Sequence, residues 1–118
     1  MSNGTVCYLE IPAADLDASA GFYQRVFGWS LRGHADTGRP AFDTPGGVSG
    51  QFVLNRPPSR DAGVVTYVMV EDMDITIEAV VANGGEVVQP PFDTGGGAPA
   101  ATFRDPFGNL FGLYQERR

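Results

Sequence analysis

Asp15-Leu16-Asp17 recurs 57 residues later as Asp72-Met73-Asp74, and this repeat decides the fold. Each triplet follows an apolar stretch and precedes apolar residues at helical spacing, so its first aspartate is expected to cap a helix. The interval is close to half of the 118 residues. A repeat of this kind is typical of a duplicated structural unit. The sequence therefore predicts two copies of one strand–helix–strands module, with a shared surface between them.

The first module is expected over residues 5–55. Thr5 to Ile11 is rich in β-forming residues and is followed by Pro12, which ends the strand. The next segment is predicted to be a helix that stops at Gly28. Its apolar stripe consists of Leu16, Ala20, Tyr23 and Phe27. Three further strands are predicted over Trp29 to Ala35, Pro40 to Thr44, and Val48 to Leu54.

Residues 56–63 have no periodicity and form the predicted linker to the second module, residues 64–115. This module begins with an apolar strand over Val64 to Val70. The stripe of its helix is Met73, Ile77, Val80, Val81 and Ala82. The strands that follow are Glu86 to Gln89, Ala98 to Arg104 and Leu110 to Gln115, with a loop over Pro90 to Gly97 and a tight turn over Asp105 to Asn109.

The order βαβββ–βαβββ predicts a single α+β domain over residues 1–118. A curved mixed sheet would carry a helix on one face in each module and leave its other face free to curl around a cup. A concave, partly apolar sheet face is a natural pocket for a small molecule. Five aromatic residues are expected to fill the core between helix and sheet: Phe22, Tyr23, Phe27, Phe103 and Phe111.

Composition excludes several functions. The net charge is −6, and all eight cations are arginine, so the chain lacks the basic surface that nucleic acids require. No apolar run is long enough to span a bilayer, and no signal peptide is expected at the start. The single Cys7 cannot form an internal disulfide, which favours a cytoplasmic location, and it is expected to be a small buried core residue.

Strand alternation places Tyr8, Glu10, Tyr67, Met69 and Tyr114 on the cup side of the sheet. Aromatic and thioether walls suit a flat, apolar ligand, although the same side chains could instead fill the cup.

Two titratable residues are candidates for acid–base chemistry. Glu10 in an apolar cup would have a raised pKa and could act as a catalytic acid or base. Alternatively, it anchors a hydrogen bond with a neighbouring strand or with Arg104. His34, the only histidine, could be a general base or simply an exposed residue at a strand end.

Several motifs resemble the vicinal oxygen chelate superfamily, which includes glyoxalase I, the bleomycin-resistance proteins and the extradiol dioxygenases. In the first module these are Glu10-Ile11-Pro12, Asp15-Leu16, Phe22-Tyr23 and Phe27-Gly28-Trp29. In the second they are Pro90-Pro91-Phe92-Asp93 and Arg104-Asp105-Pro106-Phe107-Gly108-Asn109. The resemblance implies a homodimer, and a divalent ion held in the cup by histidine and carboxylate ligands.

The resemblance places the four ligands of that ion at Tyr8, Gln51, Val65 and Gly112. Valine and glycine side chains offer no lone pair, and tyrosine is a poor ligand for such ions at neutral pH. We therefore expect no metal or other cofactor, and a small, partly aromatic molecule bound in the cup. The expected binding residues are Tyr8, Glu10, Gln51, Val65, Tyr67, Met69, Gly112 and Tyr114.

Two enzymatic alternatives stay open. One is a metal-dependent lyase, isomerase or dioxygenase that uses other ligands, such as Glu10, His34 or Gln51. The other is metal-free acid–base catalysis by Glu10.

Overall fold

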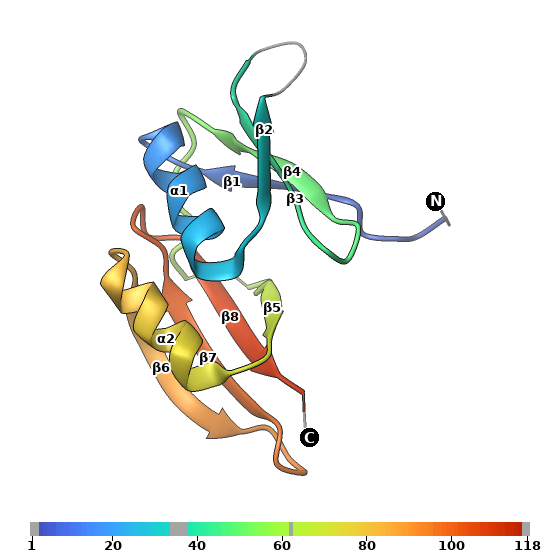
Figure 1. The fold of residues 1–118 in the computed structure, drawn as a ribbon, viewed down its shortest axis with the longest axis vertical. Helices are drawn as coiled ribbons and strands as arrows, with labels where there is room; N and C mark the ends of the chain where they lie inside the picture. Colours follow the sequence, from blue (N-terminus) through green and yellow to red (C-terminus); the bar gives the residue numbers. More distant parts are fainter. Residues whose placement is uncertain (1–2, 34–37, 62, 117–118) are drawn as a thin grey trace.

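The computed structural model describes residues 3–33, 38–61 and 63–116 (Figure 1). Two βαβββ modules follow one another along the chain, which confirms the predicted α+β fold. Module one consists of β1 (Tyr8–Pro12), α1 (Leu16–Phe27), β2 (Ser30–Gly33), β3 (Pro40–Asp43) and β4 (Ser49–Val53). Module two consists of β5 (Tyr67–Val70), α2 (Met73–Ala82), β6 (Glu86–Asp93), β7 (Pro99–Arg104) and β8 (Leu110–Gln115).

Each module forms its own four-stranded mixed sheet. The strand orders are β1-β4-β3-β2 and β5-β8-β7-β6. In both sheets the first strand runs parallel to the last strand of its module, and the remaining pairs are antiparallel. β1 and β5 are therefore edge strands, and the strands of the described residues form two sheets rather than one continuous sheet.

The helix boundaries follow the predicted caps. The Asp15 carboxylate accepts a hydrogen bond from the Ala18 amide at 3.0 Å, and Asp72 accepts one from the Ile75 amide at 3.1 Å. Gly28 ends α1 in the left-handed conformation at φ 71°, where glycine has no steric penalty. Among the described residues, no helix is long and apolar enough to cross a membrane.

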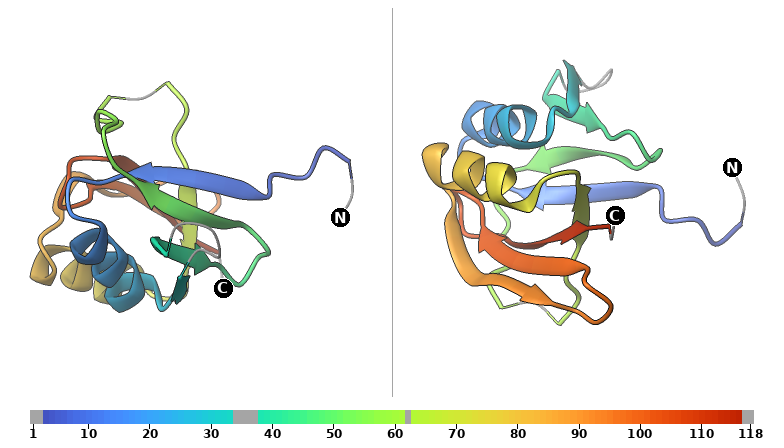
Figure 2. Two further views of the ribbon diagram at one scale, coloured as in Figure 1. Left: turned by 90° about the horizontal axis from the view of Figure 1, so that it is seen from above. Right: turned by 60° about the horizontal axis from the view of Figure 1, so that its bottom comes forward.

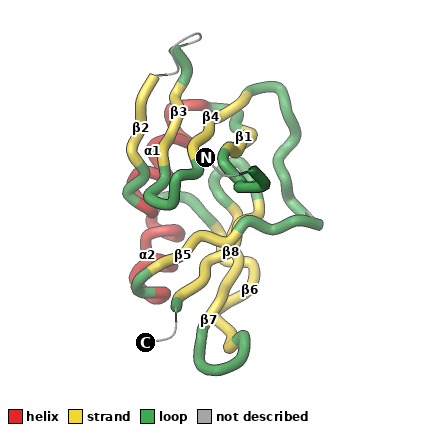
Figure 3. Tube along the Cα trace, turned by 90° about the vertical axis from the view of Figure 1, so that its right-hand side faces the viewer, coloured by secondary structure: helices red, strands yellow, loops and turns green. Residues whose placement is uncertain are grey.

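Both helices lie side by side on the same side of the molecule (Figures 2 and 3), and ring contacts from α1 reach both sheets. The ring of Tyr23 lies 5.7 Å from Phe52 in the first sheet and 5.5 Å from Phe111 in the second. The five predicted core aromatics all belong to this core or pack against it. Since the helix-facing sides of the two sheets share one core, the opposite side of each sheet, its free face, points away from that core.

A buried polar cluster joins the two modules beneath the β7–β8 turn. The Asp105 carboxylate accepts hydrogen bonds from the Tyr23 hydroxyl at 2.8 Å and from the Asn109 side chain at 2.8 Å. It also accepts bonds from the backbone amides of residues 107–109. The Asn109 amide nitrogen additionally donates to the Pro12 carbonyl at 2.7 Å, so this turn is tied to both α1 and β1.

Several predicted details were wrong. β1 begins at Tyr8, three residues later than expected, because its partner Ser49 is the first residue of β4. β5 begins at Tyr67, also three residues later, and the Leu110 amide at the start of β8 donates to the Ser59 carbonyl of the linker rather than to the residues before β5. Cys7 is therefore exposed rather than buried. Val81 and Ala82 are exposed at the end of α2, where the predicted stripe turns toward solvent.

The predicted loop over Pro90 to Gly97 also needs correction, because β6 continues to Asp93. Register shifts between Val87 and Phe92 accommodate the two prolines, which cannot donate to a regular ladder. The Asp93 carboxylate then accepts hydrogen bonds from the Gly95 and Gly97 amides and closes a short turn. His34 lies outside the described residues.

Candidate functional site

The free face of module one is polar. Strand register places Glu10 opposite Gln51, and Tyr8 opposite Ser49. Gln51 is half-buried, and its side-chain oxygen is buried with no hydrogen-bond partner. Three predicted binding residues, Tyr8, Glu10 and Gln51, are thus brought together on two neighbouring strands.

Glu10 lies in an ion pair rather than in apolar surroundings. Its carboxylate accepts a hydrogen bond from Arg56 Nη1 at 2.8 Å, and its side chain is 38% exposed. The expected alternative partner, Arg104, instead forms ion pairs with Asp61 and Glu86 at 3.3 and 3.4 Å. Glu10 therefore anchors the linker to β1, through a different arginine from the one predicted.

A second ion pair fixes the outer part of this face. Arg32 Nε donates to Asp43 at 2.9 Å, and the Ser49 hydroxyl donates to the same carboxylate at 2.6 Å. The hydrogen bond from Arg32 lowers the pKa of Asp43, and the bond from Ser49 adds to this effect. The same hydrogen bond to Asp43 raises the pKa of Arg32. The charges of this face are thus paired before any ligand binds.

The free face of module two is aromatic. Register places Tyr67 opposite Gly112, and Met69 opposite Tyr114. A side chain at position 112 would begin 2.4 Å from the ring atoms of Tyr67, so this ring lies directly against the Gly112 backbone. Tyr8 and Tyr67 are each 47% exposed and Met69 is 56% exposed, so these side chains line open faces and do not fill a closed cup.

The four positions that the resemblance assigns to a metal do not fit a divalent ion. Val65, just before β5, and Gly112 offer no side-chain donor atom, and the Tyr67 ring occupies the space that a ligand side chain at position 112 would need. Tyr8 and Gln51 are not directly opposite one another. Within residues 3–33, 38–61 and 63–116, no three histidine, cysteine or acidic side chains are grouped to hold a metal.

The structure also has a cavity that the sequence did not predict. The inter-module groove, with a volume of about 620 Å³, lies between the end of α1, the β3–β4 turn and β5. Its walls include Val26, Phe27 and Trp29, with Tyr67 and Met69 from the predicted set. Trp29 and the turn could not be assigned to it from the sequence, because they meet β5 only through the packing of the two modules.

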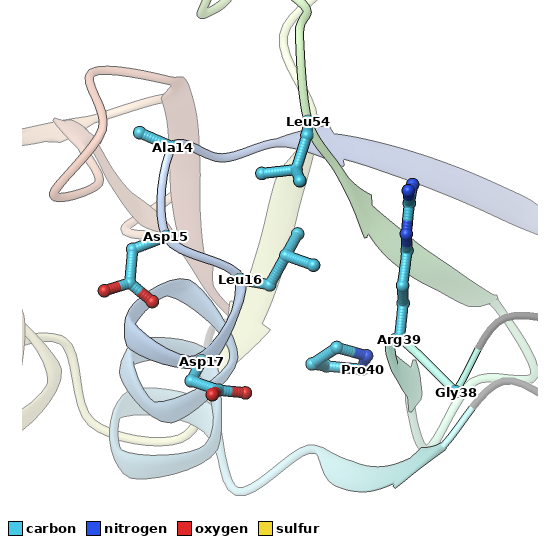
Figure 4. A pocket seen from close by; sticks show the side chains of 8 residues that line it. All are labelled: Ala14, Asp15, Leu16, Asp17, Gly38, Arg39, Pro40 and Leu54. Atoms are coloured by element: carbon cyan, nitrogen blue, oxygen red, sulfur yellow. The ribbon is translucent and has the colours of Figure 1, made fainter.

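Two further hollows lie in the part of the chain that the structure describes. A cavity of about 110 Å³ at the seam between β1 and β8 includes Glu10 and Leu110. An open hollow of about 480 Å³ lies at the start of α1, where Figure 4 shows Asp15 and Asp17 on one side and Arg39 and Pro40 on the other. The Asp15 carboxylate there already serves as the helix cap.

The sequence model of the Glyoxalase/Bleomycin resistance protein/Dioxygenase superfamily matches residues 5–113, and the chain belongs to this superfamily. Two relatives are named "Putative glyoxylase CFP32", from Mycobacterium bovis and Mycobacterium tuberculosis, and are 32% identical over 128 residues. A "Glyoxylase-like domain-containing protein" of Didymella fabae is also 32% identical, over 94% of this chain and 93% of its own. The match covers 98% of this chain but 47% of the mycobacterial proteins, so the chain spans about half their length.

A relative with a more specific name is "Anthracycline biosynthesis protein DnrV" of Streptomyces peucetius, which is 27% identical over 96% of this chain and 47% of its own. Among solved structures, a glyoxalase/bleomycin resistance protein/dioxygenase family enzyme from Burkholderia phytofirmans has a TM-score of 0.76 at 20% identity. That match covers 95% of this chain and 98% of the other. These structures support the fold alone.

Proposed function

We propose that this protein binds a small, partly aromatic molecule in a cup built from the free faces of its modules, without a divalent metal. The observation that supports this most strongly is the Tyr67 ring against Gly112, where metal-binding relatives would need a ligand. An exposed ring on a glycine backbone offers a flat stacking surface. The polar face of module one, with the unpartnered Gln51 oxygen, offers hydrogen bonds to the edge of such a molecule.

We further propose a cytoplasmic homodimer. The free faces of both sheets are open in a single chain, and a second copy placed over them encloses the ligand. The exposed apolar side chains of Tyr8, Tyr67 and Met69 support such an association. The exposed thiol of Cys7 is best preserved in a reducing compartment.

Planar polycyclic compounds are the first ligands to test, since the Streptomyces relative is named for anthracycline biosynthesis. A panel of such compounds is screened by thermal shift. We expect an anthraquinone in this thermal-shift panel to raise the melting temperature of the protein equally with and without EDTA. Tyr67→Ala should remove most of the shift because it removes the stacking surface. Val88→Ala, at an exposed residue of β6, serves as the matched control and should retain it. A shift that requires a divalent ion would contradict the proposal.

A further inference from the structure

The inter-module groove is bounded by residues of the shared core, whereas the proposed cup lies on the free faces of the sheets. Phe27 at the end of α1 and Trp29 just after it form one wall, and β5 lies beneath them (Figure 1). Both rings also pack in the core, with their centroids 5.5 Å apart. Only Tyr67 and Met69 belong both to the groove and to the predicted cup. A volume of about 620 Å³ is large enough for a drug-sized molecule.

Trp29 brings an unused hydrogen-bond donor to the groove. Its side chain is 4% exposed and stacks with the rings of Tyr23 and Phe42, at centroid distances of 5.0 and 4.8 Å. Among the described residues its indole N–H has no hydrogen-bond partner, yet the unpartnered side-chain atoms that are fully buried are those of Gln51 and Arg104. The indole nitrogen therefore keeps some accessible surface, and of the three hollows only the groove is lined by Trp29. Since a largely buried indole N–H usually has a partner, a ligand oxygen in the groove would supply it.

The other polar groups of the groove limit the charge of a ligand. Glu71 is the only charged side chain among the described residues that line it. The Thr44 hydroxyl donates to the Val48 carbonyl at 2.7 Å, and the Thr76 hydroxyl donates to the Asp72 carbonyl at 2.8 Å, so both protons are already used. An anion would meet a negative side chain and no lining cation. The groove therefore favours an uncharged molecule whose polar atom is a hydrogen-bond acceptor.

We propose that the inter-module groove is a second small-molecule site, which binds an uncharged, apolar molecule that carries a ketone or ether oxygen. That oxygen accepts a hydrogen bond from the Trp29 indole N–H, and the apolar body of the molecule lies between Phe27, Val48 and Tyr67. The site goes beyond the proposed function, because it needs neither the free faces of the sheets nor a second copy of the chain.

Trp29 is the only tryptophan of the chain, so its fluorescence reports on the groove directly. The probe is progesterone, a neutral, apolar diketone. The matched probe is the analogue in which a carboxylate replaces the acetyl group, so that one ketone and the ring system are kept and a negative charge is added. We expect progesterone to change the Trp29 emission saturably and the carboxylate to bind at least about tenfold more weakly.

Two glycine variants test where the probe binds. Gly46, on the β3–β4 turn, lines the groove, and Gly63, before β5, does not. A side chain at either position would begin with no atom within 4 Å, and neither residue has a positive φ. Gly46→Phe should obstruct the groove and weaken progesterone binding at least about tenfold, whereas Gly63→Phe should bind as the unaltered protein does. Trp29→Phe keeps a ring in the core but loses the donor, so its affinity by calorimetry should fall about two- to tenfold.

Three results would overturn the groove site. They are the absence of a saturable change in Trp29 emission, equal binding of progesterone by the two glycine variants, and binding of the carboxylate as tight as that of progesterone. Loss of the anthraquinone shift in Gly46→Phe would also overturn it, because the groove and the cup would then be one site. If that shift persists while progesterone binding is lost, the two sites are distinct.

Sedimentation separates the groove site from the homodimer of the proposed function. A protein that is monomeric at micromolar concentration would contradict the homodimer and leave the groove site in place. A homodimer that ignores progesterone and dissociates in Gly46→Phe, but not in Gly63→Phe, would assign the groove to the subunit interface and overturn the groove site. In either case, ligand binding in the cup would still be judged by the anthraquinone shift.

Discussion

Single residues decide what each face of the molecule can do. The Tyr67 ring forms an aromatic surface against Gly112, and Glu10 forms an ion pair with Arg56. In the interior, the Tyr23 hydroxyl is tied to Asp105, and burial together with that carboxylate raises the pKa of Tyr23 well above its usual value. The chemistry of each residue is therefore set by one or two neighbours that belong to other elements.

Gly112→Ala tests the contact that the Tyr67 ring makes. The added carbon would meet the ring at 2.4 Å, so the ring must rotate away from the backbone. We expect a loss of stability of about 1–3 kcal/mol in urea titrations and a clear loss of ligand binding in the thermal-shift panel. An equally stable variant that binds normally would contradict the placement of the ring.

Tyr23→Phe tests the buried cluster. At neutral pH we expect a loss of about 1 kcal/mol, because Asp105 keeps its other donors. The folded-state pKa of Tyr23 is raised, so its stabilising effect is complete below the unfolded value of 10.0 and declines as pH rises above it. The stability difference between the two proteins should therefore shrink between pH 8 and about pH 11. A constant difference over that range would contradict the raised pKa.

At the scale of elements, the sequence predicted what is decided locally. Both aspartate caps and the Gly28 stop are confirmed, because the cap residue and the apolar stripe lie within one segment. β8 was predicted to the residue. The starts of β1 and β5 and the length of β6 were missed, because the extent of a strand depends on its partner, which lies elsewhere in the sequence.

Helix capping provides a matched pair of variants. Asp72→Ala removes the acceptor for the Ile75 amide and should cost about 1 kcal/mol, whereas Asp72→Asn retains an acceptor and should cost little. Urea unfolding of the three proteins measures both values. Equal losses in the two variants would show that the negative charge near the helix start, rather than the hydrogen bond, matters at this position.

Gly50→Ala probes the packing of β4 between its neighbours. An added carbon would lie 2.0 Å from the Leu9 carbonyl oxygen and 2.5 Å from the Phe42 ring. Because backbone blocks it on one side and a buried ring on the other, we expect a loss of at least about 3 kcal/mol by urea unfolding. The same substitution at Gly46, where no atom lies within 4 Å, is the control and should be close to neutral.

At the scale of the whole molecule, the duplication gives two modules that share one core and present two different free faces. The fold could be predicted because the repeat and the motifs are visible in the sequence, and superfamily membership is confirmed by the match over residues 5–113. Strand alternation predicted that Glu10 and Tyr67 lie on the cup face, but not the register that places them opposite Gln51 and Gly112. The inter-module groove could not be predicted, since it depends on how α1, β5 and the β3–β4 turn pack together.

The measurement that most directly tests the central proposal is metal binding by the purified protein after treatment with EDTA. Calorimetric titration with zinc, nickel, manganese and ferrous ions should show no stoichiometric site, and none of these ions should shift the melting temperature appreciably. One ion bound per chain, and lost in Gln51→Ala or Glu10→Ala, would contradict the proposal and favour a metal-dependent enzyme of the superfamily.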